Sequence, residues 1–181
     1  PDVEQDIREC VKYWEDKTLV GYLRESLSEE ILKAWDSGII DETWVVGAGL
    51  GNEIPDYQLV LKKGLKDVLD RASKRRAEID PKEPDGVKKI FFLDGVIKGN
   101  DAVINFANRI AAECGKAAAR AKDPKTRAEL SELADICRHV PLNPARTFHE
   151  AVQSIYLILL AVHLESNGHA ISLGRFDQYV Y

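Results

Sequence analysis

Hydrophobic residues recur every three or four positions over most of the chain, which is the period of an amphipathic helix. Near the N-terminus, for example, Val3, Ile7, Val11 and Trp14 fall on one helical face. The predicted helices cover about residues 3–14, 27–37, 57–76, 87–121, 125–139 and 145–166. The pattern therefore predicts a predominantly α-helical chain.

Two stretches interrupt the helical period. Residues 44–52 are apolar and rich in glycine, which predicts a strand or an extended segment that enters a loop. Two prolines and a glycine mark a second loop near residues 80–86, the clearest break in the chain. We therefore expect a few short strands beside the helices, and a single segment over residues 1–181 with an internal loop break near 80–86.

Three helix starts carry capping signals. Ser26, followed three residues later by Glu29, has the pattern of a capping box. Asp123–Pro124 and Asn143–Pro144 each place a capping side chain before a proline, and proline is favoured at the first helical position. We expect helices to begin after each of these signals.

Residues 155–162 are apolar on every face of the predicted helix. The run falls well short of the roughly 20 residues that cross a bilayer, so we predict a buried helix rather than a membrane span. A helix that is apolar all round needs neighbours on every side. Since the chain also opens at Pro1 and contains no methionine, we expect it to be a piece of a longer protein.

Composition narrows the class of protein. The 181 residues are 45% hydrophobic and 30% charged with a net charge of -5, which excludes a disordered tail and a strongly basic nucleic-acid binder. Cys10, Cys114 and Cys137 form no CxxC pair and no zinc pattern, and the first of the 181 residues do not have the pattern of a signal peptide, although an upstream segment could carry one. We therefore predict reduced thiols in a cytoplasmic protein that binds neither membrane nor nucleic acid.

Several single features suggest chemistry, but each has a simpler explanation. Residues 47–52 are rich in glycine, as a dinucleotide-binding fingerprint is. That fingerprint needs glycine at its sixth position, where this sequence has Asn52, so a flexible loop is the simpler interpretation. His149 and His163 would lie about 21 Å apart along one helix, too far to share a metal. The cations beside Cys137 would lower its pKa, yet no general base accompanies it, which favours a structural thiol.

Residues 167–179 bring imidazole, hydroxyl, guanidinium, carboxylate and amide groups directly after the buried helix. Polar groups delivered from a buried element are either structural anchors or site residues, and the residues alone leave both open. Arg175 and Asp177 would share one side of an extended strand, where we expect them to pair.

Three segments resemble the glycyl radical enzymes. They are Asn52–Tyr57 continuing into Val60–Leu65, then Val140–Ala151, then Glu165–Tyr179. The similarity is to the pyruvate formate-lyase-like branch, which includes glycerol and diol dehydratases, choline trimethylamine-lyase and arylacetate decarboxylases. It follows essentially the whole chain in order.

The resemblance implies a part of a much larger α/β barrel of ten strands. In that family an activase with an iron-sulfur cluster and S-adenosylmethionine places a radical on a C-terminal glycine, which passes it to a cysteine that abstracts a substrate hydrogen. Both residues lie beyond the matched segments, so the resemblance implies no catalytic residue, bound cofactor or metal in this chain. It also implies a small-molecule substrate, the activase and a second copy in a homodimer as partners of the whole protein.

The resemblance assigns substrate contacts to Asn52, His169 and Ala170. Dehydratase-like members often present a histidine at the first position and His-Ser at the other two, so His169 matches whereas Asn52 and Ala170 depart. Loss of an imidazole and a hydroxyl weakens a site for a small polyol, which leaves the substrate open. The alternative is a helical interaction module without catalysis, which would fold independently.

Overall fold

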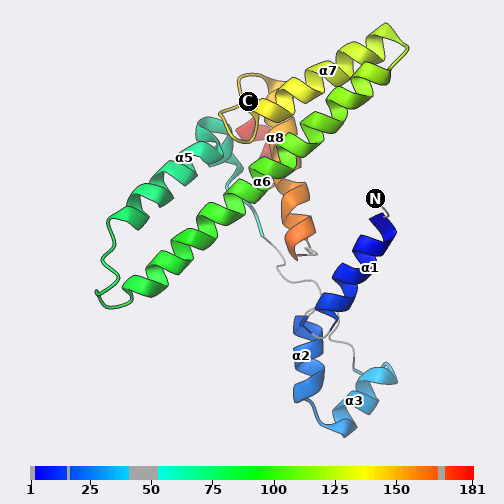
Figure 1. Ribbon diagram of the computed structural model, residues 1–181, viewed down its shortest axis with the longest axis vertical. Helices are drawn as coiled ribbons and strands as arrows, with labels where there is room; N and C mark the ends of the chain where they lie inside the picture. The colour runs from blue at the N-terminus through cyan, green and yellow to red at the C-terminus, as the bar shows by residue number, and fades with distance from the viewer. Residues whose placement is uncertain (1–2, 16, 41–52, 167–169) are drawn as a thin grey trace. The chain divides into compact units, whose positions relative to one another are not determined.

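The computed structural model describes residues 3–15, 17–40, 53–166 and 170–181, and every regular element among them is a helix (Figure 1). The helices are α1 (Val3–Trp14), α2 (Leu19–Ser26), α3 (Glu29–Asp36), α5 (Tyr57–Ala77), α6 (Gly86–Arg120), α7 (Pro124–His139), α8 (Phe148–Ser166) and α9 (Phe176–Tyr179). The predominance of helix is thus confirmed. The described ranges contain no strand, and the strand predicted over 44–52 lies outside them. None of the helices they contain is long and apolar enough to span a membrane.

Contacts divide the chain into two units, residues 1–52 with 165–170, and residues 53–164 with 171–181. The first unit contains α1, α2 and α3. Thr18 caps α2 by accepting a bond from the Gly21 amide at 3.1 Å. Arg24 on α2 pairs with Asp36 on α3 at 2.8 Å, which joins these two helices.

The capping box predicted at Ser26 is wrong. Ser26 is the last residue of α2, and its hydroxyl donates to the Leu23 carbonyl. Ser28 caps α3 instead, accepting a bond from the Ile31 amide at 3.4 Å. The two serines lie two positions apart, and the pattern alone did not decide which one leaves the helix and which one begins the next.

In the second unit, α5, α6 and α7 form two consecutive antiparallel hairpins (Figure 1). The first hairpin turns in the predicted loop, and Arg76 holds Asp94 across it with two hydrogen bonds. The second turns at Asp123, whose carboxylate caps α7 ahead of Pro124, as predicted. Small buried residues let α6 and α7 approach closely; they are Ala107, Ala111, Ala118 and Ala134.

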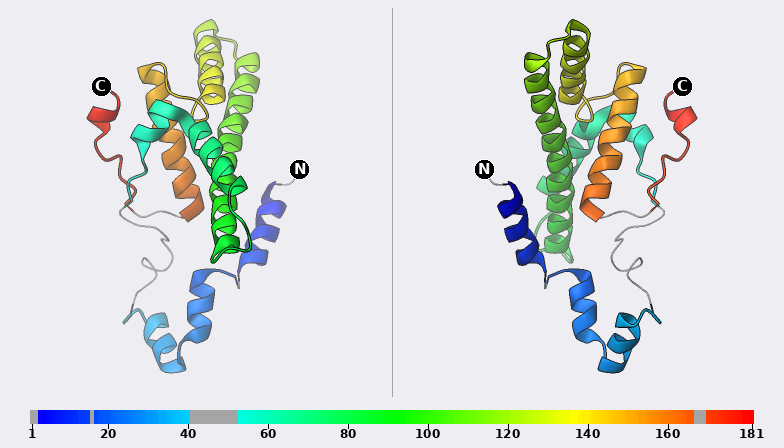
Figure 2. Two further views of the ribbon diagram at one scale, coloured as in Figure 1. Left: turned by 90° about the vertical axis from the view of Figure 1, so that its left-hand side faces the viewer. Right: turned by 90° about the vertical axis from the view of Figure 1, so that its right-hand side faces the viewer.

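Helix α8 packs on two sides of this framework (Figure 2). Ile155 and Ile158 join a cluster with the first half of α5, whereas Leu157, with no exposed surface, packs among residues of α6 and α7. Tyr156 remains 54% exposed. The all-round apolar surface predicted from the sequence is thus only partly covered within this chain.

The predicted start of the last long helix at Ala145 is wrong by three residues. Helix α8 begins at Phe148, and Thr147 caps it by accepting a bond from the Glu150 amide at 3.1 Å. The Ala145 amide instead donates a hydrogen bond to the Leu61 carbonyl of α5 at 3.0 Å. Thr147 and Glu150 also have capping-box spacing, a signal that lies four residues beyond Asn143.

The path of α5 breaks at Gly64, which has a left-handed φ of 72°. The break frees backbone groups, and the loop that follows α7 bonds to them. Leu65 and Lys66 donate to the carbonyls of Pro141 and Leu142 at 2.8 and 3.0 Å. A Cβ at Gly64 would contact the Leu142 carbonyl and lie 2.8 Å from the Asn143 Cα, so only glycine fits there.

We predict that Gly64→Ala lowers the free energy of unfolding by about 2–5 kcal/mol, because it combines a left-handed alanine with a backbone clash. Urea unfolding followed by circular dichroism measures the change. Gly95→Ala in α6 is the matched control, since nothing lies within 4 Å of its added Cβ. The control is expected to raise stability by at most about 1 kcal/mol; equal effects of the two substitutions would contradict the prediction.

Candidate functional site

The three segments that carry the family resemblance meet around the first half of α5. The second segment, Val140–Ala151, forms backbone hydrogen bonds with α5 on both sides of Gly64. The third segment contacts α5 through α9, where the Tyr57 and Tyr179 rings lie 6.3 Å apart at 43°. Figure 2 shows the start of α5, α8 and the C-terminal segment gathered in one part of this unit. Segments nearly ninety residues apart in sequence therefore form one structural feature.

The first and third segments are joined by a short set of contacts. The Ser172 amide donates to the Glu53 carbonyl at 2.9 Å. Gly174 has a φ of 62°, and a Cβ there would lie 2.8 Å from Ile54 Cγ2 and 2.9 Å from the Tyr179 hydroxyl. We call Glu53, Ile54, Ser172, Gly174 and Tyr179 the junction.

Tyr57 is the first residue of α5 and packs beside the junction residue Tyr179; it is only 1% exposed. Burial, followed by the nearby Tyr179 phenol, raises the pKa of Tyr57 above its ordinary value. Its hydroxyl therefore keeps its proton near neutral pH. No described residue supplies that hydroxyl with a hydrogen-bond partner.

The predicted substrate contacts lie beside the junction in the sequence. Asn52 and His169 lie outside the described residues. Ala170 is described, is exposed and adopts a left-handed φ of 59°, which is uncommon for a residue with a Cβ. Such backbone outliers concentrate at functional sites.

A buried carboxylate stabilises the loop that supports α5. Glu150 is 3% exposed and accepts bonds from the Arg146 amide and guanidinium, both at 2.6 Å. The Arg146 side chain lowers the pKa of Glu150, against the opposing effect of burial. His139 Nε2 lies 4.0 Å from the same carboxylate and 2.9 Å from the Pro144 carbonyl. These contacts link the end of α7, the loop and the first turn of α8.

Other candidates from the sequence are structural. The lowered pKa considered for Cys137 is wrong: burial, followed by the neighbouring Cys114, raises its pKa to about 11, and only 1% of its surface is exposed. His149 is exposed and lies 3.5 Å from Glu132. No cluster of three or more metal-ligating side chains occurs within the described ranges.

The ion pair expected between Arg175 and Asp177 is absent. The two residues are not on an extended strand, because α9 begins at Phe176 and Arg175 precedes it as the N-cap. One helical turn points side chains two positions apart in different directions. No salt bridge joins these two described residues.

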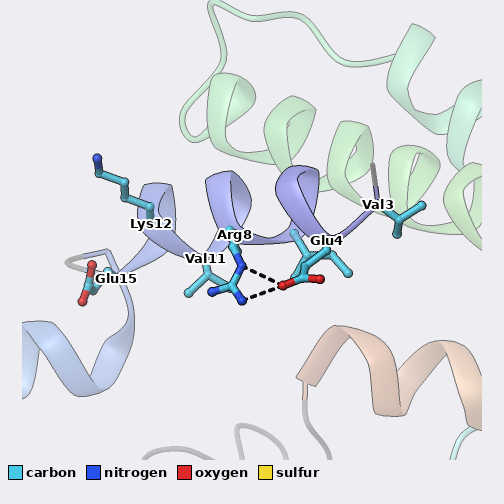
Figure 3. Close-up of a pocket in the computed structure, with 7 residues that line it drawn as sticks. Val3, Glu4, Arg8, Val11, Lys12 and Glu15 are labelled. Atoms are coloured by element: carbon cyan, nitrogen blue, oxygen red, sulfur yellow. Dashed lines mark hydrogen bonds and ion pairs between the residues drawn. The ribbon is translucent and has the colours of Figure 1, made fainter. Parts of the chain in front are cut away.

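A hollow of about 840 Å³ lies along α1 and is lined by residues of that helix and by Glu15, which follows it (Figure 3). Its apolar side chains, Val3, Ile7 and Val11, are each more than half exposed. The polar contact within it is a pair between Arg8 and Glu4 at 2.6 Å on the same helix. Among the described residues, no polar group from another helix lines this hollow, so the junction is the better candidate site.

The comparisons with known proteins agree with the three segments. A family model for pyruvate formate lyase-like proteins matches residues 1–181. The chain belongs to this family. Isethionate sulfite-lyase from Nitratidesulfovibrio vulgaris is 34% identical over 190 aligned residues, which cover 99% of this chain and 23% of that protein. The resemblance to glycyl radical enzymes is thereby confirmed.

Solved structures support the same assignment for this pyruvate formate lyase-like chain. The glycerol-bound B12-independent glycerol dehydratase from Clostridium butyricum gives a TM-score of 0.82 at 33% identity over 98% of this chain. A glycyl radical enzyme from Archaeoglobus fulgidus gives a TM-score of 0.77 at 30% identity over 94%. In both cases the chain spans 22% of the solved chain.

Sequence reasoning missed Gly174 and Glu150 in this pyruvate formate lyase-like chain. A glycine between Leu173 and Arg175 gave no sign that two distant side chains would crowd it. Glu150 received no role of its own from the sequence, whereas its spacing from Thr147 was an available capping signal.

We predict that Glu150→Gln weakens the fold most near neutral pH, by about 1–3 kcal/mol. The pKa of the folded carboxyl is lowered, so its stabilisation is full above the unfolded value of about 4.5 and is lost as the pH falls through the folded value. The unfolding free energies of the two proteins should therefore converge as the pH falls below about 4.5 and through the lowered pKa of the folded carboxyl.

The control for this prediction is Glu113→Gln, which removes a carboxylate that pairs with Lys116 on the exposed surface. It should leave the stability close to that of the unmutated chain throughout, because exposed pairs contribute little. A constant difference for Glu150→Gln over the whole pH range would contradict a role for its charge.

Proposed function

We propose that this chain is part of a longer glycyl radical lyase and supplies one wall of its substrate pocket. The observation that carries the proposal is the junction, which joins the first and third family segments through the Ser172–Glu53 hydrogen bond. The chain spans only 23% of the isethionate sulfite-lyase relative and 22% of glycerol dehydratase. A longer protein of that size would contain the catalytic residues outside these 181 residues.

The expected substrate contacts are close to the junction in the sequence. Asn52 directly precedes Glu53, and His169 is three residues before Ser172. This closeness along the chain supports a substrate pocket near the junction.

The side chains at these positions favour a substrate other than a simple polyol. Asn52 offers amide donors and an acceptor, His169 offers an imidazole, and Ala170 offers no polar group. A hydroxyl that faced Ala170 would lose a partner, which is costly in a desolvated pocket. The reaction is a dehydration, a carbon–nitrogen cleavage, a decarboxylation or a release of sulfite like that named for the isethionate sulfite-lyase relative, and the two departures from the dehydratase pattern leave its substrate open.

The radical chemistry belongs to the rest of the protein. In this family the glycyl radical, installed by an S-adenosylmethionine-dependent activase, supplies hydrogen abstraction through a cysteine. Cys137 is buried with a raised pKa, and none of the three cysteines lies in the matched segments. The chain therefore contributes no catalytic residue, and we expect the whole enzyme to be a cytoplasmic homodimer.

The decisive experiment is anaerobic activation of the full-length protein with its activase. We expect a glycyl radical signal in electron paramagnetic resonance and turnover of a member of a panel of isethionate, glycerol, propane-1,2-diol, choline and an arylacetate. The 181-residue chain alone should form no radical. A full-length protein that forms no radical, together with a sharp two-state unfolding of this chain, would favour the interaction module instead.

We predict that Ala170→Ser raises the full-length enzyme's preference for propane-1,2-diol over its best substrate by up to about tenfold, because one added hydrogen bond contributes about 0.5–1.5 kcal/mol. The ratio of the two kcat/KM values measures this preference. Ala170→Gly is the matched control: it relieves the left-handed φ of 59° without adding a hydroxyl and should leave the ratio unchanged. An equal shift in both variants would remove the serine hydroxyl from the explanation.

A further inference from the structure

We propose that the junction is a positioning clamp, in which close contact at Gly174 fixes the path of residues 171–174 against the residues that precede α5. The inference rests on the proposed function, because the expected substrate contacts at 169 and 170 directly precede this segment in the sequence. Gly174 and Ile54 act as positioning residues, since neither is assigned a contact with substrate.

The close approach at Gly174 involves two segments from opposite ends of the unit. Ile54 precedes α5, and Tyr179 lies in α9, and both would come within 3 Å of an added Cβ. Gly174 also donates its amide to the Ser172 hydroxyl at 3.1 Å, so the turn supports the residue that bonds to Glu53. The segment is therefore fixed by a backbone bond at Ser172 and by steric contact two residues later.

The left-handed conformation alone does not create such a contact. Gly38 has a φ of 75°, similar to that of Gly174, yet nothing lies within 4 Å of an added Cβ there. An alanine substitution at Gly38 therefore measures the effect of the backbone conformation without a clash, and one at Gly174 measures both together. Gly38→Ala is thus the control for Gly174→Ala.

The two side chains that face Gly174 differ in their surroundings. The Tyr179 ring packs beside Tyr57, which is 1% exposed within the cluster formed by α5 and α8. Ile54 is 55% exposed, and branching at its Cβ restricts its χ1 rotation. The Tyr179 side therefore resists displacement most, and an added methyl group is expected to shift residues 171–174 away from it.

The clamp is tested first in the full-length protein, before activation, by amide hydrogen exchange. Gly174→Ala should speed exchange of the Ser172 amide at least tenfold, whereas Gly38→Ala should not change it. Adding Ile54→Ala and Tyr179→Phe to Gly174→Ala removes both clashing groups and should restore slow exchange. Unchanged exchange in Gly174→Ala, or no recovery in the triple variant, would overturn the clamp.

The positioning role is tested in the activated full-length enzyme with the same substrate panel. Gly174→Ala should lower kcat/KM at least tenfold, mainly through a higher KM, with an unchanged glycyl radical yield, and the triple variant should recover most of it. Faster exchange at Ser172 with unchanged kinetics would overturn the positioning role. Failure of the unmutated enzyme to turn over any probe would count against the proposed function, and the exchange result would still decide the clamp.

Discussion

The backbone contact between Gly64 and the loop after α7 is the constraint on which the second unit depends. Because Gly64 lacks a side chain and adopts a left-handed φ, the Leu142 carbonyl can approach α5 closely. Three backbone hydrogen bonds then join this loop to α5 around the break. The same loop places the Ala145 amide on the Leu61 carbonyl of α5, and α8 begins three residues later at Phe148.

Charge reinforces this arrangement at one buried point. Most ion pairs of the described residues lie on exposed helix surfaces at spacings of three or four residues, where each contributes little. Glu150 differs because its carboxylate is 3% exposed and receives both backbone and side-chain donors from Arg146. Loss of a donor there would leave a buried charge uncompensated, which costs far more than loss of a surface pair.

The uncovered apolar surfaces fit a chain that belongs to a larger assembly of elements. Several apolar side chains are more than half exposed. They are Val3, Ile7 and Val11 on α1, and the adjacent pair Phe91 and Phe92 on α6. Single exposed apolar residues are ordinary, but a repeated helical stripe such as that on α1 is the pattern of a face that packs against something. Relatives more than four times as long as this chain supply the natural explanation.

The sequence by itself determined the helical class, the approximate bounds of the longest helices and the family, because these follow from periodicity and from local motifs. The Asp123–Pro124 cap, for example, depends only on adjacent residues and was predicted correctly. The starts of α3 and α8 were misplaced because competing caps lie within a few positions. Only the tertiary structure decided that Gly64 and Gly174 are sites of close approach, since the atoms that crowd them come from residues distant in the sequence. It likewise decided that Cys137 is an inert buried thiol, because burial among α6, α7 and α8 outweighs the cations beside it in the sequence.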